Sequence, residues 1–520
     1  MKNTIVKFLF VLTAGAALSS CMKDTQPTGV ITQERLSEVI QAHPEKFEAT
    51  INGIYSDIQT WSNPGISHNY FGQKGFDYLT SLQGNDMIMT GRFAMSLYHY
   101  LLDYWQADYN ATLTRWREYY NNIANANGVL KVATADVTDP AMRQYRAIAL
   151  GIRGYSYLQL SYLYQYSYYV GADDTVWGKG AKYDHSQDKL VPLVDENTTE
   201  DQPRSTVSAV FDFLIKDLEE AYAIFDAIDA VRTASPTDVD GCVVATYLAR
   251  AYMIKHDWAN AQKYAKVVMD NFGILTSEDD ILQGFSDINL PDVVWGCDIT
   301  SDNTGIYRSW FSLMDYFGDG YAGIGVWRAG FGPFVDRIDD DDIRREWFLD
   351  GRNPLTPKIA AVAYQSIKFI GAGRKQVFGS GFDGTGWELG DYIYLRSEEA
   401  YFMYAECLAH QGNLSEAITA LEAIMSTRQP GYSCPAADKA DFLEELNFQK
   451  RVEFWGEGME FLDNRRLNIP IDRTDETWGA ANNHLAAARF YHDQEDREFL
   501  YQIPVSEIEN NKQINESDQN

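Results

Sequence analysis

Hydrophobic positions between Asp391 and Gln429 recur every three or four residues in two successive runs, the period of an amphipathic helix. The runs consist of Leu395, Glu399, Phe402, Ala405 and Leu408, and of Leu414, Ala417, Ile418, Leu421 and Met425. Gly412 stands between them, where a helix commonly ends, and Pro430 follows the second run. The pattern therefore predicts an antiparallel helical hairpin of the tetratricopeptide type.

Earlier blocks of the chain carry the same helical period, at residues 115–133, 142–165, 205–225 and 242–270. In the last of these, Ala249 and Ala261 stand at nearly the same offsets as Ala405 and Ala417 in the hairpin above. One such hairpin cannot bury its apolar face alone, so several must pack together. We expect a mostly α fold, a tetratricopeptide-like helical scaffold with long loop-rich insertions that contain short strands.

Three long segments interrupt the helical blocks, at about residues 61–106, 168–204 and 272–391. They are rich in Gly and aromatic residues, and the longest contains strand-like pieces such as residues 368–373. Aromatic residues make up 14% of the chain, and many of them fall in these insertions. Long loops inside a compact domain are uncommon unless they serve a function, so we expect the insertions to carry a binding surface.

The first 21 residues have the pattern of a targeting segment. Lys2 and Lys7 precede an apolar run that is too short to span a bilayer, and Leu18-Ser-Ser-Cys21 follows. This ending resembles a bacterial lipobox and predicts a signal peptide over residues 1–20 with lipidation of Cys21; the alternative is an ordinary secretory signal with an incidental Cys. A lipidated chain would be tethered to a membrane without crossing it.

The charge balance narrows the possible ligands. With 44 basic and 74 acidic residues the net charge is −30, which disfavours nucleic acid as a partner. The remaining cysteines form no C-x-x-C pair that would suggest a metal knuckle, and their disulfide state stays open. We expect no cofactor. The acidic run at Asp336 and 339–342 fits a solvated turn, with a structural calcium site as the alternative.

Sequence signals of an enzyme are weak. Residues 318–323 match G-x-G-x-x-G, but no hydrophobic strand leads into them, which argues against a dinucleotide site. The chain contains no H-E-x-x-H and no G-x-S-x-G motif. A glycosidase would need two carboxyl groups about 5 to 9.5 Å apart, and the sequence does not place them.

Several segments, taken in order, resemble the SusD/RagB family of outer-membrane nutrient-binding lipoproteins of Bacteroidetes. No single piece is decisive, but their order and spacing span nearly the whole chain. The matching segments are Leu18-Ser-Ser-Cys21, 47–58, 116–130, 153–164, the VPL of 191–193, 204–221, 245–265, 394–417, 450–466 and 501–514.

The resemblance implies that residues 21–520 form a single SusD-like domain. It also implies a cell-surface lipoprotein of the outer membrane that captures an oligosaccharide or polysaccharide and delivers it to a SusC-like TonB-dependent transporter, without catalytic activity. Two alternatives stay open: a peptide-binding member of the same family, and a glycoside hydrolase on an α-repeat scaffold.

Characterised members of the family bind ligands on aromatic surfaces formed by loops between helices. Equivalent loops here predict glycan stacking and hydrogen bonding by Tyr98, Trp105, Asn110, Asp302, Trp310, Tyr321 and Trp327. For each aromatic residue the alternative is core packing or contact with the transporter. Arg451, Glu457 and Arg465 fall in the C-terminal family motif, where we expect a structural ion network.

Overall fold

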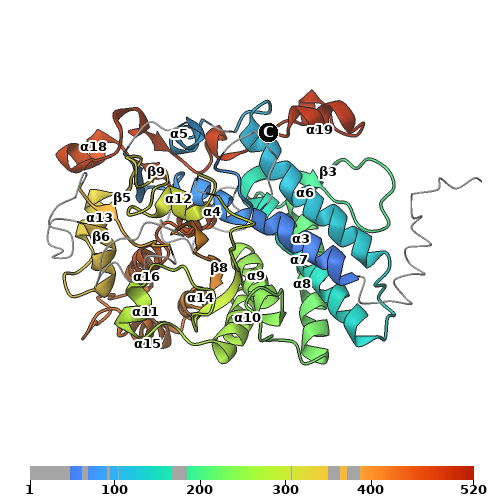
Figure 1. Ribbon diagram of the computed structural model, residues 1–520, viewed down its shortest axis with the longest axis horizontal. Coiled ribbons are helices and arrows are strands. Elements are labelled where there is room, and N and C mark those ends of the chain that lie inside the picture. Colours follow the sequence, from blue (N-terminus) through green and yellow to red (C-terminus); the bar gives the residue numbers. More distant parts are fainter. Residues whose placement is uncertain are drawn as a thin grey trace, which may run out of the picture. The chain divides into compact units, whose positions relative to one another are not determined.

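Paired antiparallel helices dominate the computed structural model (Figure 1), which describes residues 47–60, 68–90, 94–103, 105–166, 184–305, 307–349, 363–371 and 387–520. The predicted signal peptide and the predicted lipid site at Cys21 lie outside these ranges. Residues 49–520 form one compact unit. Within the described part of the chain, every helix is too short or too polar to cross a lipid bilayer.

The N-terminal half is built on long helices that follow one another along the chain. These are α3 (Glu48–Thr60), α6 (Asn110–Leu130), α7 (Pro140–Tyr164) and α8 (Val207–Ala227), with α7 packed between α6 and α8. Their starts follow capping rules: Asp139 accepts a hydrogen bond from the backbone N–H of Met142, and Thr206 accepts one from Ala209. Gly154 lets α7 approach α8 closely, because a Cβ there would meet Leu218 at 2.6 Å.

Two helical hairpins of the tetratricopeptide type pack against each other although they are distant in sequence. They are α9 (Gly241–Ile254) with α10 (Trp258–Asn271), and α14 (Glu398–His410) with α15 (Leu414–Met425). Gly412 ends α14 with a positive φ of 85°, as the sequence predicts. Helix α10 packs against α14. The rings of Trp258 and His410 stack between the two helices, with centroids 3.9 Å apart. The predicted tetratricopeptide-like scaffold is confirmed.

Shorter helices and the C-terminal helices complete the unit. The α-helices are α4 (Gln73–Ser81), α5 (Ala94–Tyr100), α11 (Glu278–Leu282), α12 (Trp310–Met314), α13 (Gly332–Asp336), α16 (Lys439–Glu453), α17 (Met459–Leu467), α18 (Asp475–Trp478) and α19 (Val505–Asn510). The 3₁₀ helices are η2 (Ile343–Trp347), η4 (Trp387–Leu389), η5 (Gly479–Ala481), η6 (Ala486–Ala488), η7 (Arg497–Phe499) and η8 (Glu516–Asp518).

The strands are short and most lie in the predicted insertions. One antiparallel sheet has the order β1-β5-β7-β6, with β1 (Met87–Met89), β5 (Arg328–Gly330), β7 (Gln365–Ser366) and β6 (Phe348–Leu349). Two-stranded antiparallel pairs are β2 (Lys189–Pro192) with β3 (Arg204–Thr206), β4 (Val293–Cys297) with β8 (Tyr392–Arg396), and β9 (Ile471–Asp472) with β10 (Tyr491–His492). The first sheet joins the first and the longest insertion, because β1 pairs with β5.

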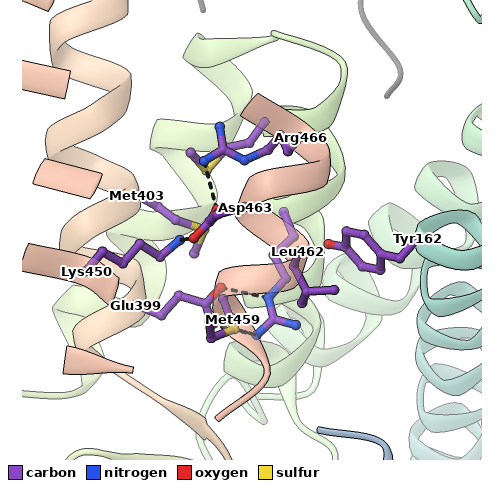
Figure 2. Close-up of a pocket in the computed structure, with 10 residues that line it drawn as sticks. Tyr162, Glu399, Met403, Lys450, Met459, Leu462, Asp463 and Arg466 are labelled. Atoms are coloured by element: carbon purple, nitrogen blue, oxygen red, sulfur yellow. Dashed lines mark hydrogen bonds and ion pairs between the residues drawn. The ribbon is translucent and has the colours of Figure 1, made fainter. Parts of the chain in front are cut away.

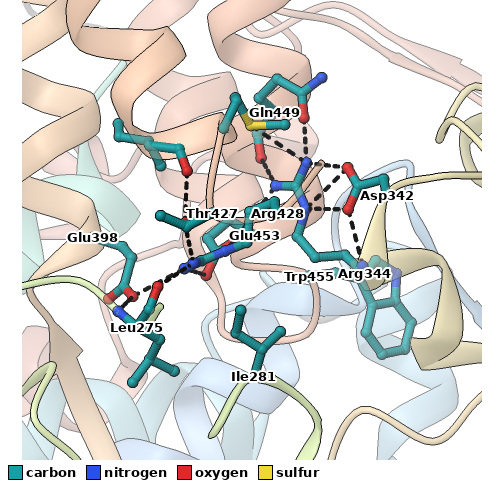
Figure 3. A network of polar contacts seen from close by, with 12 residues as sticks. Leu275, Ile281, Asp342, Arg344, Glu398, Thr427, Arg428, Gln449, Glu453 and Trp455 are labelled. Carbon is teal, nitrogen blue, oxygen red and sulfur yellow. Dashed lines mark hydrogen bonds and ion pairs between the residues drawn. The ribbon is translucent and has the colours of Figure 1, made fainter. Parts of the chain in front are cut away.

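A buried ion network joins α14, α16 and the segments beside them (Figure 3). Arg428 donates to Glu453 and Glu398 at 3.0 Å, and Arg396 donates to Glu453 at 3.0 Å. Arg344 forms an ion pair of 2.6 Å with Asp342. Burial alone would raise the pKa of Glu453, but Arg428 and Arg396 outweigh it and hold that pKa well below its usual range.

The C-terminal motif residues behave largely as the sequence predicts. Arg451 forms a bidentate ion pair with Asp86, and Glu457 pairs with Arg396 and Lys368. Arg465 donates to the backbone carbonyls of Gln494 and Gln165. The four cysteines after Cys21 are all free, which settles the open disulfide question: Cys242, Cys297, Cys407 and Cys434.

Candidate functional site

Two small cavities lined partly by charged residues lie among the described residues of the helical scaffold. One of about 10 Å³ lies between α7, α9, α14, α16 and α17 (Figure 2). Around it, Arg250 pairs with Glu399 at 2.7 Å and Lys450 pairs with Asp463 at 2.7 Å. Such a cavity has room for about one water molecule and none for a sugar.

Three aromatic rings gather at the surface where the first and the longest insertion meet. The ring centroids of Tyr307 and Tyr321 are 5.2 Å apart, and the His68 ring lies 6.1 Å from Tyr307 and 5.7 Å from Tyr321. A hydrogen bond joins His68 Nδ1 to the Tyr321 hydroxyl. Tyr307 is 43% exposed, and Ile324, which follows Tyr321 in the same loop, is 64% exposed. We call His68, Tyr307 and Tyr321 the aromatic triad.

His68 is held by the segment that leads into α4. The next residue, Asn69, is buried and donates a 2.6 Å hydrogen bond to Ser96 on α5. Gly72 precedes α4 with a φ of 76°, and a Cβ there would lie 2.2 Å from the Ile58 carbonyl oxygen, so only glycine fits this turn. These buried anchors fix the backbone that follows His68, whose own side chain is exposed.

Tyr307 is positioned by the buried start of α12. Ser309 caps this helix, and Trp310 is only 1% exposed. The Trp310 ring lies 4.3 Å from Lys74 Nζ and packs edge-on against Phe369 at 5.0 Å. Trp310 therefore belongs to the core and offers no open face to a sugar, which corrects the sequence prediction for this residue. Its burial anchors the loop that presents Tyr307.

Tyr321 lies in a compact loop folded back onto α12. Its backbone N–H donates to Ser312 Oγ at 3.4 Å, and the N–H of Ala322 donates to the Ser312 carbonyl at 2.8 Å. Glycine is required at position 323, where the backbone passes closest to Gly318, because a Cβ there would overlap the Gly318 carbonyl oxygen. A tight loop therefore explains the glycines of residues 318–323, which agrees with the sequence argument against a dinucleotide site. Partial burial, and to a smaller extent Tyr307, raises the pKa of Tyr321.

Three other predicted residues lie together around the start of α6. Tyr98 is 46% exposed on α5 and makes an edge contact with Tyr109 at 6.4 Å. Trp105 is half-buried, and the Arg497 guanidinium lies over its ring, 4.5 Å from the centroid. Asn110 is exposed at the first position of α6. Helix α5 is tied to the residue beside His68 through the Ser96–Asn69 hydrogen bond.

The last two predicted residues differ in exposure. Asp302 is exposed on a turn that precedes Tyr307. Trp327 is partly buried against a small core of Tyr316, Leu349 and Ile367. Its backbone N–H donates to Thr90 Oγ1 and its carbonyl accepts from the Thr90 N–H, which continues the pairing of β1 with β5. Trp327 Nε1 is buried without a hydrogen-bond acceptor among the described residues. This ring therefore serves mainly as packing under the loop.

Sequence reasoning missed His68 and Tyr307, two members of the triad. Both fall inside insertions that the sequence predicts to carry a binding surface, but neither is among the residues predicted there. The available signal was local: the segment from Trp310 onward has the apolar pattern of a helix, which favours burial, whereas Tyr307 precedes it beside Gly305 in a loop. Trp310 is predicted instead because it is a large aromatic residue of the longest insertion.

The predicted acidic turn makes direct contacts with protein donors. Asp336 accepts from the Tyr364 hydroxyl at 2.8 Å, Asp339 accepts from Gln429 at 2.8 Å, and Asp342 pairs with Arg344. These carboxylates turn toward separate partners and do not share a centre.

Two family models match the chain. The model described as "Starch-binding associating with outer membrane" matches residues 43–253, and the model of the SusD family matches residues 378–520. The two ranges do not overlap and together cover more than half of the chain. No curated protein matches the chain significantly.

Solved structures share the fold over nearly the full length. A SusD-like carbohydrate-binding protein from Bacteroides vulgatus is 21% identical, with a TM-score of 0.72 over 91% of this chain and 97% of its own. A SusD superfamily protein from Bacteroides thetaiotaomicron is 19% identical, with a TM-score of 0.70 over 92% and 99%. Surface glycan-binding protein A from Bacteroides thetaiotaomicron, solved with laminarihexaose, is 15% identical, with a TM-score of 0.64 over 90% and 98%.

Proposed function

Because the chain belongs to the SusD/RagB family, we propose that it captures an oligosaccharide or polysaccharide on its aromatic triad and passes it to a SusC-like TonB-dependent transporter. The observation that carries the proposal is the clustering of His68, Tyr307 and Tyr321 at the surface. The family description, which associates starch binding with the outer membrane, supports the same ligand class. So does the glycan complex of the Bacteroides thetaiotaomicron neighbour.

The triad has the chemistry that a sugar ring requires. An apolar pyranose face laid on an aromatic ring removes about 60 Å² from water, which contributes about 1.5 kcal/mol. Two stacked sugars and three hydrogen bonds of about 1 kcal/mol each give about 6 kcal/mol before the cost of association. The expected affinity is millimolar to micromolar, which suits a protein that must release its ligand to a transporter.

The remaining predicted residues extend the surface. We assign Tyr98 as a second stacking residue, because it is exposed on the helix tied to the His68 segment. Asn110 and Asp302 supply polar groups at the rim, and Trp105 and Trp327 support the loops. Because Trp105 and Trp327 are partly covered, their replacement should affect binding through loop position.

Peptide binding is the weaker alternative because the triad presents aromatic rings and no formal charge except on a protonated His68. A hydrolase would need reactive carboxyl groups at an accessible site. Of three carboxyl groups with clearly raised pKa values, Glu118 is buried, and Asp77 and Glu460 are only partly exposed. We therefore propose a binding protein without catalytic activity, held at the cell surface by lipidated Cys21.

The proposal is tested by electrophoresis of the mature protein, with Cys21 omitted, through gels that contain neutral, anionic or host-derived glycans. We expect one class of glycan to retard the protein, and we expect Tyr307→Ala and Tyr321→Ala to remove most of that retardation. Incubation with the same glycan should yield no new reducing ends. Retardation by no glycan, or release of product, would contradict the proposal.

A matched control separates loss of the site from loss of an exposed tyrosine. Tyr491 is 46% exposed, close to the 43% of Tyr307, but lies on β10 near the C-terminus. Tyr491→Ala should leave retardation unchanged. Equal losses in Tyr491→Ala and Tyr307→Ala would show that the triad is not the glycan site.

A further inference from the structure

One cluster of potential metal ligands lies outside the aromatic triad, in the segment from β10 to η7. His492 Nδ1 lies 3.1 Å from Asp496 Oδ2 and 3.8 Å from Glu498 Oε2. All three atoms lie within 4.8 Å of one another. Among the described residues, this is the one group of three or more His, Cys, Asp or Glu side chains whose donor atoms converge in this way.

The separations fit a small divalent ion. Zinc binds imidazole nitrogen at about 2.0 to 2.1 Å and carboxylate oxygen at about 2.0 to 2.2 Å, which puts neighbouring ligands about 3.0 to 3.5 Å apart in a tetrahedral or octahedral shell. The 3.1 Å pair already has this spacing. A small rotation of the Glu498 side chain, which is 36% exposed, would bring the 3.8 Å pair into the same range.

The first two ligands are held in place before any ion binds. The His492 ring packs edge-on against Phe490 at 5.0 Å and Phe499 at 6.3 Å, while its backbone pairs with Ile471 in the β9–β10 pair. Asp496 Oδ2 accepts the backbone N–H of Asp493 at 3.0 Å. Less conformational entropy therefore has to be lost when the ligands close around an ion.

Comparison with the acidic turn at 336–342 shows why this cluster differs. In that turn each of Asp336, Asp339 and Asp342 accepts a hydrogen bond from a Tyr, Gln or Arg side chain. Glu498 faces His492 beyond hydrogen-bonding distance and has no donor among the described residues. The neighbouring Arg497 places its guanidinium over the Trp105 ring. A cation would offset the mutual repulsion of the two carboxylates.

We infer that His492, Asp496 and Glu498 form a binding site for a first-row divalent transition-metal ion such as Zn²⁺. One imidazole with two carboxylates suits zinc, manganese or cobalt, whereas calcium and magnesium favour oxygen ligands alone. The ion would join β10 to η7 and so fix the C-terminal segment that carries Arg497 against Trp105. The inference does not rest on the proposed glycan function, although the ion would also steady Trp105, which supports a loop of that surface.

The test is calorimetric titration of the metal-free mature protein with Zn²⁺, followed by absorption spectroscopy with Co²⁺. We expect one ion per chain with a dissociation constant in the micromolar range or below. His492→Gln and Glu498→Gln should each weaken binding at least tenfold. The Co²⁺ spectrum should show nitrogen and oxygen ligands without the near-ultraviolet band of a thiolate.

Asp339→Asn is the matched control, because it removes an exposed carboxylate that accepts a hydrogen bond from Gln429. It should bind Zn²⁺ like the wild type, and all variants should keep the wild-type melting temperature when metal-free. No stoichiometric binding, equal binding by His492→Gln and Glu498→Gln, or a thiolate band that implicates Cys434 would each overturn the inference.

Discussion

The aromatic triad and the buried ion network around Glu453 place functional and structural side chains in opposite environments. The network is almost fully buried: Arg344, Arg428 and Glu453 are each at most 1% exposed, and each is paired with an opposite charge. The triad is at least partly open to solvent and is supported from beneath by Trp310, Asn69 and the loop glycines. Substitutions in the network should therefore change stability, whereas substitutions in the triad should change binding and leave stability nearly unaltered.

The largest effect is expected from Glu453→Ala. The substitution leaves Arg428, Arg396 and Arg344 buried without their shared carboxylate, and breaking a buried pair from one side costs about 3 to 5 kcal/mol. Denaturant unfolding should show this loss in the free energy of unfolding. Glu509→Ala, at an exposed position on α19, should change that free energy by less than about 0.5 kcal/mol. Similar losses of unfolding free energy in the two variants would contradict the stabilising role of the buried network.

Asp77 extends the comparison, because it is a partly buried carboxyl outside the ion network around Glu453. Burial raises its pKa to about 6, although Lys74 and Gln73 act in the opposite direction. The folded state therefore holds this proton more tightly than the unfolded state, so stability falls as pH rises from about 4 to 6 and stays lower above that range.

Asp77→Asn should abolish this contribution. Relative to the variant, the wild type should lose on the order of 2 kcal/mol of unfolding free energy between pH 4 and pH 7. Unfolding of both proteins at each pH provides the measurement. The same pH dependence in both would show that Asp77 does not titrate in this window.

Tyr307→Ala tests the triad side of the comparison. Loss of one stacking face should weaken glycan binding by about 1.5 kcal/mol, roughly tenfold, while the melting temperature stays within a few degrees of wild type. Isothermal titration with the glycan retained on gels gives the affinity, and calorimetric melting gives the stability. A large loss of stability without a specific loss of affinity would place Tyr307 among the structural residues.

The smallest effect is expected from Lys266→Ala. Lys266 pairs with Asp270 at 2.5 Å, but the two side chains are 53% and 59% exposed, so water already solvates both charges. The unfolding free energy should change by less than about 0.5 kcal/mol. A cost near that of Glu453→Ala would mean that burial is not what distinguishes the ion network.

The sequence predicts the scaffold well because its signal is local. The period of apolar positions and the glycine at 412 determine α14 and α15 without reference to the rest of the chain. The same holds for α9 and α10, where Asp257 caps the second helix. Interactions within a few residues decide such elements, and tertiary packing then preserves them.

The site is predicted only in part because its members depend on contacts between distant segments. Nothing near Trp310 in the sequence reveals that Lys74 and Phe369 cover it, and nothing near His68 reveals its hydrogen bond with Tyr321. The partners of Glu453 were likewise not identified, although the ion network of the C-terminal motif was expected. Composition located the insertions, but only tertiary structure separates their exposed rings from their anchors.

The most direct test of the central claim is a crystal structure of the mature protein with the oligosaccharide that it retains on gels. The account predicts sugar rings stacked on Tyr307 and Tyr321, with His68 within hydrogen-bonding distance and Trp310 still covered by Lys74 and Phe369. Ordered sugar on another surface, with the triad free, would contradict it.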